Sequence, residues 1–373
     1  MRSTQRRSCN VSTVTVAATD FLSDVSKQST EGSVEVGFCG EPFADNGELL
    51  SSLSPLLFNM KLFGLYFHRD DRHRRRTDDP EWNPSTATTY TSSTRLQVYA
   101  TVVLILMWLN FIRTITIFNA GDHFGALLLM KIMMITWFCL AAIFQTAYYY
   151  ASHTGRLVKI LMMLPVTRDC VRGAHHCAIT LTAIIWTFLL SDLAIGSYLY
   201  FNSLVLDFIK APFVTHIGVP EDNMTVAKIL AYISYLVIFP GVYFSHGMNQ
   251  LLGYVFYSEY KKLKKNFHRA LGQQGQFTGD LSLFRRRHQM LSHAVSKVDG
   301  FLKFGNVAGF VCHIVNIVLL IYSIIFLPAE SRNDFVSGVI YAFWLVLNVY
   351  GLFFSANAAI TINHMVRMHS VLC

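Results

Sequence analysis

The sequence carries little charge for its length. Only 14% of its 373 residues are Asp, Glu, Lys or Arg, whereas 53% are hydrophobic, and the mean hydropathy is +0.38. A typical soluble domain has about 25% charged residues. The chain is therefore too apolar for an ordinary soluble domain, and its apolar residues are too unevenly spread for a fibrous protein. Both observations predict a polytopic membrane protein.

The short motifs of soluble enzymes are absent from the sequence. It has no Walker loop, no Gly-rich dinucleotide turn, no Gly-x-Ser-x-Gly elbow and no His-Glu-x-x-His. We therefore expect neither an enzyme nor a cofactor. The net charge of +8 raises nucleic acid as a partner, but the Lys and Arg residues lie in loops between apolar spans. The positive-inside rule accounts for them there, and no nucleic-acid partner is expected.

The seven cysteines form no recognisable disulfide framework. They fall in the polar N-terminus, inside apolar spans or in loops that we place in the cytosol. Cys170, His175, His176 and Cys177 form a cluster whose spacing fits no standard zinc pattern, so no metal is expected there. Palmitoylation of Cys170 or Cys177 is an open alternative.

Six apolar segments are long enough to cross a bilayer, which needs about 20 residues at about 1.5 Å per residue. They predict an all-α, polytopic membrane helical bundle. The predicted spans are about 97–118, 125–151, 178–201, 226–248, 304–327 and 335–362.

The remaining segments divide the chain into three parts. Residues 1–53, rich in Ser, Thr, Gly and acidic residues, predict a disordered cytosolic tail without a cleavable signal peptide. Residues 54–96 predict a short interfacial or packed helix and then a basic cytosolic segment, whose Arg residues at 72–76 are interpreted as a topogenic or lipid-headgroup patch. Residues 97–373 form the membrane bundle, with a basic cytosolic loop at 257–303.

Assigning the Lys/Arg-rich loops to the cytosol places both termini inside. The sequon Asn223-Met224-Thr225 then lies outside, so Asn223 is a predicted glycosylation site. The sequon at Asn10 lies in the cytosolic tail and should stay unmodified. A cytosolic N-terminus is opposite to the arrangement of G-protein-coupled receptors and disfavours that class.

Residues 285–326 predict a cytoplasmic helix that continues into a membrane helix. Leu291, Val295, Val298 and Leu302 recur at three- and four-residue steps, which indicates one buried stripe, and the charges vanish from Phe304 onward. The fourth span should likewise continue past the membrane, since apolar residues keep the same spacing from Leu252 to Phe267.

Asp192 and a group of aromatic residues are the candidate ligand-binding positions. A lone carboxylate within a span costs on the order of 3 kcal/mol on insertion scales. Asp192 should therefore face a ligand pocket, form a structural ion pair or be protonated. The aromatic candidates cluster toward the outer halves of spans three and four, above a possible kink at Pro240-Gly241. They are Tyr198, Phe201, Tyr232, Tyr235 and Phe239. His246 and His313 are single histidines on apolar helices and are interpreted as core residues in preference to ligand contacts.

One pattern resembles a known family. The Arg-x-x-His-x-x-Leu pattern at Arg285, His288 and Leu291, followed by a Phe/Gly-rich entry into a long apolar helix, is similar to the region before the fifth membrane helix of insect-type gustatory receptors. The similarity extends loosely over residues 54–373. It implies a chemosensory receptor for small organic tastants such as sugars or bitter compounds, set among membrane lipids and acting as a subunit of a ligand-gated cation channel, in a homo- or hetero-oligomer that is a tetramer in that family.

The chain departs from the family pattern at the pore. The family has seven helices and a Thr-Tyr and Gln-Phe signature in the last, which lines the pore, whereas the single Thr-Tyr here is Thr89-Tyr90 in a polar segment. We therefore expect no current from this chain alone, and a truncated, non-conducting receptor isoform is one alternative. A small-solute transporter is another, although the sequence shows one Pro-Gly break and no internal repeat.

Overall fold

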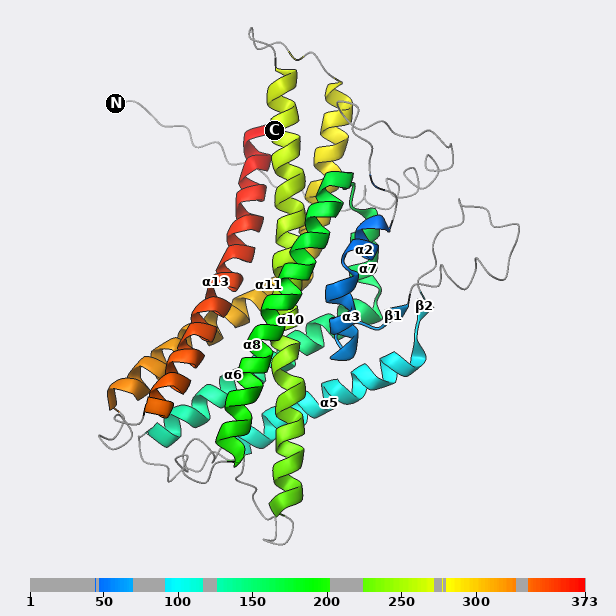
Figure 1. The fold of residues 1–373 in the computed structure, drawn as a ribbon. Helices are drawn as coiled ribbons and strands as arrows, with labels where there is room; N and C mark the ends of the chain where they lie inside the picture. The colour runs from blue at the N-terminus through cyan, green and yellow to red at the C-terminus, as the bar shows by residue number, and fades with distance from the viewer. Residues whose placement is uncertain are drawn as a thin grey trace, which may run out of the picture.

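The computed structural model describes residues 44, 47–69, 91–116, 126–201, 224–271, 277, 280–326 and 335–372. Within these ranges the chain is helical apart from one short antiparallel pair of strands, β1 (His68–Arg69) and β2 (Thr91–Ser92), which confirms the all-α class. The helices are α2 (Glu48–Ser52), α3 (Ser54–Leu62), α5 (Thr94–Thr116), α6 (Ala126–His153), α7 (Arg156–Met163), α8 (Arg168–Phe201), α10 (Met224–Ala270), α11 (Leu281–Phe326) and α13 (Phe335–Leu372). Figure 1 shows their arrangement.

Five of the described helices are long and apolar enough to cross a membrane. The segments are Thr94–Ile115, Lys131–His153, Arg168–Ile195, Leu281–Ile325 and Gly338–Asn357. The chain is thus a multi-pass membrane protein. The predicted fourth span lies in α10, where the side chains of residues 224–235 are outside what the structure describes, so the count of six and the side of the N-terminus stay predictions.

α10 is the central helix of the bundle. Every residue from Ile238 to Asn249 is buried, and α10 packs against α3, α5, α6, α8, α11 and α13. Figure 1 shows it running almost the full height of the molecule. A helix that other helices surround need not face lipid, which explains why this one tolerates Ser245, His246 and Asn249 among its apolar residues.

The outer helices, by contrast, present apolar side chains to their surroundings. On α11 an exposed stripe repeats every seven residues at Phe304, Val311, Val318 and Ile325, which are 52–71% exposed. α5 is exposed in the same way, for example at Val98 and Leu109. Surfaces this apolar and extended belong in hydrocarbon or against another protein, so these faces agree with a membrane setting.

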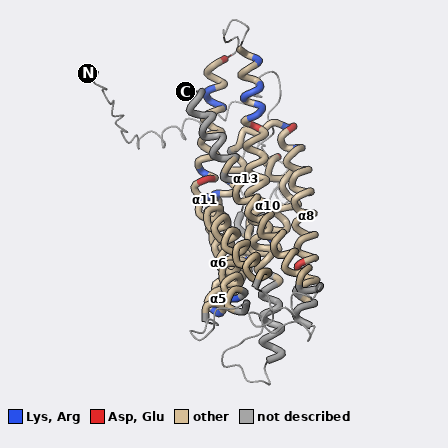
Figure 2. Tube along the Cα trace, turned by 90° about the vertical axis from the view of Figure 1, so that its left-hand side faces the viewer, with Lys and Arg blue, Asp and Glu red and all other residues tan. Residues whose placement is uncertain are grey.

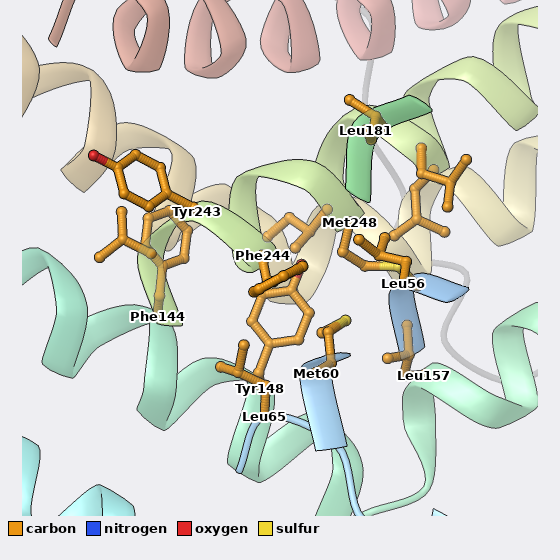
Figure 3. Close-up of a cluster of buried hydrophobic side chains, with 14 of the residues drawn as sticks. Leu56, Met60, Leu65, Phe144, Tyr148, Leu157, Leu181, Tyr243, Phe244 and Met248 are labelled. Atoms are coloured by element: carbon orange, nitrogen blue, oxygen red, sulfur yellow. The ribbon is translucent and has the colours of Figure 1, made fainter. Parts of the chain in front are cut away.

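The two short helices before the bundle pack into its side. Leu56 and Met60 of α3 are fully buried beside Phe244 and Met248 of α10, as Figure 3 shows. α3 is therefore packed, which is one of the two alternatives that its length allows. α2 begins at Glu48, within the segment predicted as a tail, and its Leu49 is buried in the same core.

Side chains of α6 hold the turn that follows α3. Gln145 Nε2 donates to the Gly64 carbonyl at 2.9 Å, and Ser152 Oγ donates to the Leu65 carbonyl at 3.1 Å. Carbonyls at the end of a helix have no partner within that helix, and burying them requires partners of this kind. The turn is thereby attached to the membrane bundle.

α10 and α11 continue together beyond the other helices. α11 runs unbroken from Leu281 to Phe326, and Leu291, Val295 and Val298 are buried, so the predicted continuous helix and its buried stripe are confirmed. Figure 2 shows Lys and Arg gathered on these projecting ends. Asp280 directly precedes α11, and its carboxylate accepts hydrogen bonds from Ser282 and Leu283, which lower the pKa of Asp280.

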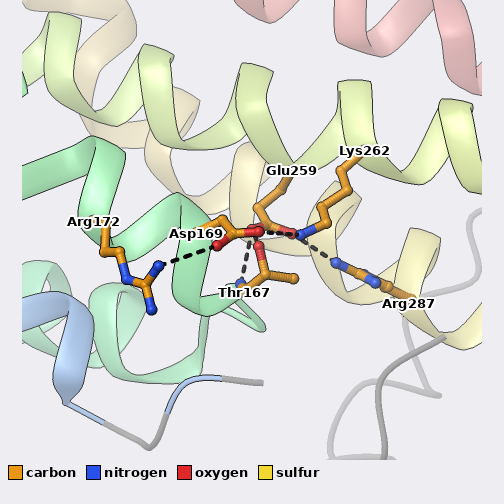
Figure 4. A network of polar contacts seen from close by, with 6 residues as sticks. All are labelled: Thr167, Asp169, Arg172, Glu259, Lys262 and Arg287. Carbon is orange, nitrogen blue, oxygen red and sulfur yellow. Dashed lines mark hydrogen bonds and ion pairs between the residues drawn. The ribbon is translucent and has the colours of Figure 1, made fainter. Parts of the chain in front are cut away.

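A buried ion pair joins the two projecting helices. Arg287 Nη2 of α11 lies 2.7 Å from Glu259 Oε2 of α10, while Glu259 Oε1 accepts from both the amide and the hydroxyl of Thr167 at 2.9 Å (Figure 4). Glu259 is completely buried. Its carboxylate therefore connects α10, α11 and the start of α8 at one point. The sequence patterns did not single out Glu259 or Arg287.

We predict that Glu259→Gln destabilises the protein by about 3 kcal/mol or more, because it removes the charge that offsets a buried guanidinium. Thermal unfolding of the purified chain in detergent measures the effect. Asp169→Asn is the control, since Asp169 meets Lys262 at 3.5 Å with 70% of its side chain exposed. Exposed pairs contribute about 0–1 kcal/mol. Equal melting temperatures for the two variants would contradict the role assigned to Glu259.

Candidate ligand cavity

A small cavity lies within the bundle, between α6, α8, α10, α11 and α13. Its volume is about 20 Å³, which is room for about one water molecule, whereas pockets for drug-sized ligands measure about 300–1,000 Å³. The residues that line it are Trp137, Leu181, Ile185, Phe188, Tyr243, His246, Gly247, His313, Leu347, Tyr350, Gly351 and Phe354. An occupant must therefore be small or must move these side chains.

Aromatic rings make up much of the cavity wall. The ring of Trp137 lies 6.3 Å from that of Tyr243, on the α10 side. On the other side, the Tyr350 ring contacts Phe188 at 5.0 Å and Phe354 at 4.1 Å. Such walls favour apolar and aromatic ligands through burial and ring stacking.

Two histidines meet at the cavity. His246 Nε2 of α10 lies 3.2 Å from His313 Nε2 of α11, and His313 Nδ1 lies 3.2 Å from Asn348 Oδ1 of α13. Asn348 Nδ2 donates to the Trp344 carbonyl at 2.9 Å, so its oxygen is the acceptor toward His313.

The direction of each bond in this chain follows from the last one. His313 Nδ1 must carry the proton that Asn348 accepts, which leaves Nε2 of a neutral His313 as an acceptor. His246 Nε2 must then be the donor. The chain therefore runs from His246 to His313, then to Asn348 and the backbone of α13. It joins three helices that are distant in the sequence.

The close approach of these helices depends on glycines. A Cβ at Gly351 would overlap the His313 imidazole, and one at Gly309 would lie 3.0 Å from Ser355 Oγ. A Cβ at Gly247 would lie 2.6 Å from the Ile185 side chain across the cavity. Glycine at these positions leaves the space that the histidine pair and the cavity occupy.

A second polar chain lies one helical turn away. The Tyr148 hydroxyl of α6 donates to Asn249 Oδ1 of α10 at 2.5 Å, and Asn249 Nδ2 donates to Asn306 Oδ1 of α11 at 2.9 Å. Together with the histidine pair, it gives hydrogen-bond partners to His246 and Asn249, which α10 carries into the core. Buried polar groups without such partners are costly, so both chains specify how α10 and α11 pack.

Asp192 and Phe239 are the predicted ligand residues whose side chains the structure describes. Asp192 is buried and does not line the cavity. The ring of Phe239 lies 5.4 Å from Trp137 and 6.4 Å from Tyr243, which both line the cavity. Phe239 therefore borders the cavity without lining it.

The remaining predicted positions lie partly or wholly outside the described residues. Tyr198 and Phe201 fall in α8 and Tyr232 and Tyr235 in α10, but their side chains are outside what the structure describes, as is all of Asn223. Tyr198 is about 15 Å along α8 from Phe188, at about 1.5 Å per residue. The cavity thus lies deeper in the bundle than the predicted aromatic cluster.

The structure also describes the residues of two other sequence patterns, the cysteine and histidine cluster at 170–177 and the Arg-x-x-His-x-x-Leu pattern at 285–291. His175 Nδ1 lies 2.8 Å from the Ser52 carbonyl, and this bond joins α8 to α2. Among the described residues, no group of three or more His, Cys, Asp or Glu side chains is placed to hold a metal. In the Arg285, His288 and Leu291 pattern, Arg285 is exposed while the other two are buried.

The histidine pair is what residue-by-residue reasoning missed. Each histidine by itself fits a core residue, and neither helix alone reveals the partner. The signal that could have found them is one histidine on each of two apolar helices that must pack together. Glycines near each histidine add to that signal.

The fold and the cavity define a multi-pass helical membrane protein with a small aromatic cavity between helices. No protein-family model and no curated protein sequence matches the chain. Its structure is similar to that of the insect olfactory receptor OR5 from Machilis hrabei, with a TM-score of 0.60 and 15% identity over 86% of this chain and 82% of the receptor. The same receptor in complex with eugenol gives a TM-score of 0.61 and 15% identity over 83% and 79% of the two chains. The chain therefore has the same fold as this receptor.

We predict that Gly351→Ala destabilises the protein by about 1–3 kcal/mol, because the added methyl group overpacks the contact with His313. Gly338→Ala in the same helix is the control, since no atom lies within 4 Å of its Cβ position. Thermal unfolding in detergent compares the two. If Gly351→Ala melts at the same temperature as Gly338→Ala, α11 and α13 do not pack as described.

Proposed function

We propose that the chain is a chemosensory membrane receptor that binds a small organic molecule in the cavity between α6, α8, α10, α11 and α13. The observation that carries this proposal is an aromatic cavity with a few polar groups, built by five helices in the fold of an insect olfactory receptor. That receptor has been solved with eugenol, a small organic ligand. A cavity in this setting favours ligand recognition over catalysis.

A gustatory-type role as a subunit of an oligomeric cation channel is the finer proposal. The Arg285, His288 and Leu291 pattern supports it. The predicted ligand residues Asp192, Tyr198, Phe201, Tyr232 and Tyr235 would form the route by which a tastant reaches the cavity. The contact of Phe239, which belongs to the same predicted set, with Tyr243 in the cavity wall supports a path from that direction.

The proposed mechanism is a shift between two packing arrangements of the helices. A ligand larger than about 20 Å³ has to displace the cavity wall, so it stabilises the arrangement with the wider cavity. The chain of bonds from His246 through His313 to Asn348 lies in that wall and joins α10, α11 and α13. Displacement at the cavity would therefore move α11 against α10, and the Glu259 and Arg287 pair carries that motion into the projecting ends.

Ligand binding at the cavity is tested by substitution at Gly247. Gly247→Ala brings a methyl group to 2.6 Å from Ile185, so it should weaken binding roughly tenfold or more, in line with overpacking costs of about 1–3 kcal/mol. A panel of small aromatic compounds, eugenol included, is titrated into the full chain in lipid nanodiscs, and tryptophan fluorescence reports occupancy beside Trp137.

The control is Gly253→Ala, in the same helix and with no atom within 4 Å of its Cβ position. It should bind like the wild type. Trp137→Phe should remove most of the fluorescence change. Binding that survives Gly247→Ala unchanged would place the ligand elsewhere and refute the assignment of the cavity.

The proposed topology has the N-terminus and the projecting ends of α10 and α11 in the cytosol, which the gathering of Lys and Arg on those ends supports. Glycosidase treatment of the protein expressed in animal cells should shift its mobility. Asn223→Gln should abolish that shift, and Asn10→Gln should leave it unchanged. If Asn10→Gln abolishes the shift instead, the N-terminus lies outside and the topology is the opposite of the one proposed.

A further inference from the structure

The cavity lies close to the outer surface of the bundle on one side. Three of the residues that line it, Phe188 of α8 and Tyr350 and Phe354 of α13, are only partly buried. The other lining residues, such as Leu181 and Leu347, are buried. On the side of α8 and α13, therefore, the cavity wall is a single layer of aromatic side chains.

These three residues close a seam between two helices that both pack against α10. The rings of Phe188 and Tyr350 meet at 5.0 Å across it, and Phe354 contacts Tyr350 at 4.1 Å. At the contact between α11 and α13, Gly351 lets the backbones approach, whereas large rings fill the α8–α13 seam. Side chains at a surface change rotamer within nanoseconds, much faster than helices move. The seam can therefore open without a rearrangement of the bundle.

The surroundings of the seam are apolar. Leu190 on α8 and Val349 and Phe353 on α13 are 50–59% exposed. Lys303 is the last charged residue before the apolar stretch of α11, and His313 in the cavity wall is ten residues farther along, which is about 15 Å. A hydrocarbon core is about 30 Å thick. The cavity and its seam therefore lie near the middle of the bilayer, where the seam meets lipid chains.

We propose that apolar ligands enter the cavity sideways from the bilayer through the α8–α13 seam, and that Phe188 and Tyr350 form its gate. The inference rests on the proposed function and adds a route to the one proposed above through Asp192. It also names the class of ligand that this route serves, which is a small compound that partitions into hydrocarbon.

Partitioning gives this route an advantage over one that starts in water. Transfer of apolar surface from water into hydrocarbon is favourable, so an apolar compound is more concentrated around the seam than in the aqueous phase. Its passage from lipid chains into a cavity with aromatic walls then exposes no apolar surface to water. Sugars do not partition into hydrocarbon, because their hydroxyls lose their hydrogen bonds there, and they would need the other route.

The first test uses a probe that cannot leave the bilayer. The full chain is placed in nanodiscs that contain a phosphatidylcholine whose acyl chain ends in a phenyl group, since chain ends lie near the bilayer centre. This lipid should compete with free ethylbenzene for the cavity of the wild type, as measured by tryptophan fluorescence beside Trp137. The same phosphatidylcholine without the phenyl group is the control and should not compete.

The second test measures the rates of ethylbenzene binding by stopped-flow fluorescence. Phe188→Ala removes one ring of the gate and should raise the association rate about tenfold, together with the dissociation rate. Loss of a wall contact alone would raise only the dissociation rate. Phe353→Ala is the matched control, because Phe353 is exposed on α13 beside the seam and does not line the cavity. Its substitution should leave both rates unchanged.

The opposing outcomes separate the route from the proposed function. If ethylbenzene binds and Gly247→Ala blocks it, but the phenyl-ended lipid does not compete, entry from the bilayer is rejected and the cavity remains the binding site. An unchanged association rate in Phe188→Ala, or an equal rise in Phe353→Ala, rejects the gate. If ethylbenzene does not bind to the wild type, the inference falls, whereas the proposed function falls only if the whole aromatic panel fails to bind.

Discussion

The burial of α10 on every side from Ile238 to Asn249 is the constraint on which the rest of this structure depends. A helix surrounded on all sides must satisfy every polar group that it carries through contacts with its neighbours, because neither water nor lipid headgroups reach it. Ser245, His246 and Asn249 lie in that buried stretch. The hydrogen bonds of His246 and Asn249 determine how α6 and α11 lie against α10, and those of His313 then position α13.

The cavity is a consequence of the same packing. Helices that carry imidazoles and rings into one layer cannot fill it completely, and glycines at 247 and 351 let the backbones approach without closing the gap. Polar groups in that layer are costly when unpaired, and the two histidines therefore bond to each other and to Asn348. Specific packing and the cavity thus come from the same few residues. At the projecting end, Glu259 plays the comparable role for α10 and α11.

Much of the fold was predictable because apolar length and helical spacing are local properties. The all-α class is confirmed, and so is the unbroken helix from residue 281 to 326 with its buried Leu291 and Val295. The fourth span shows the limit of this reasoning. Its helix exists, but helical spacing does not reveal that the stretch from Ile238 to Asn249 is buried on every side.

The sequence by itself determined the class of protein, the positions of the helices and the stripe by which α11 packs, since these follow from composition and from three- and four-residue periodicity. Tertiary structure alone decided which side chains meet. His246 and His313 are 67 residues apart and Glu259 and Arg287 are 28 apart. No local pattern encodes such pairs, because they depend on the relative depth and rotation of whole helices, and the cavity between those helices depends on them in turn.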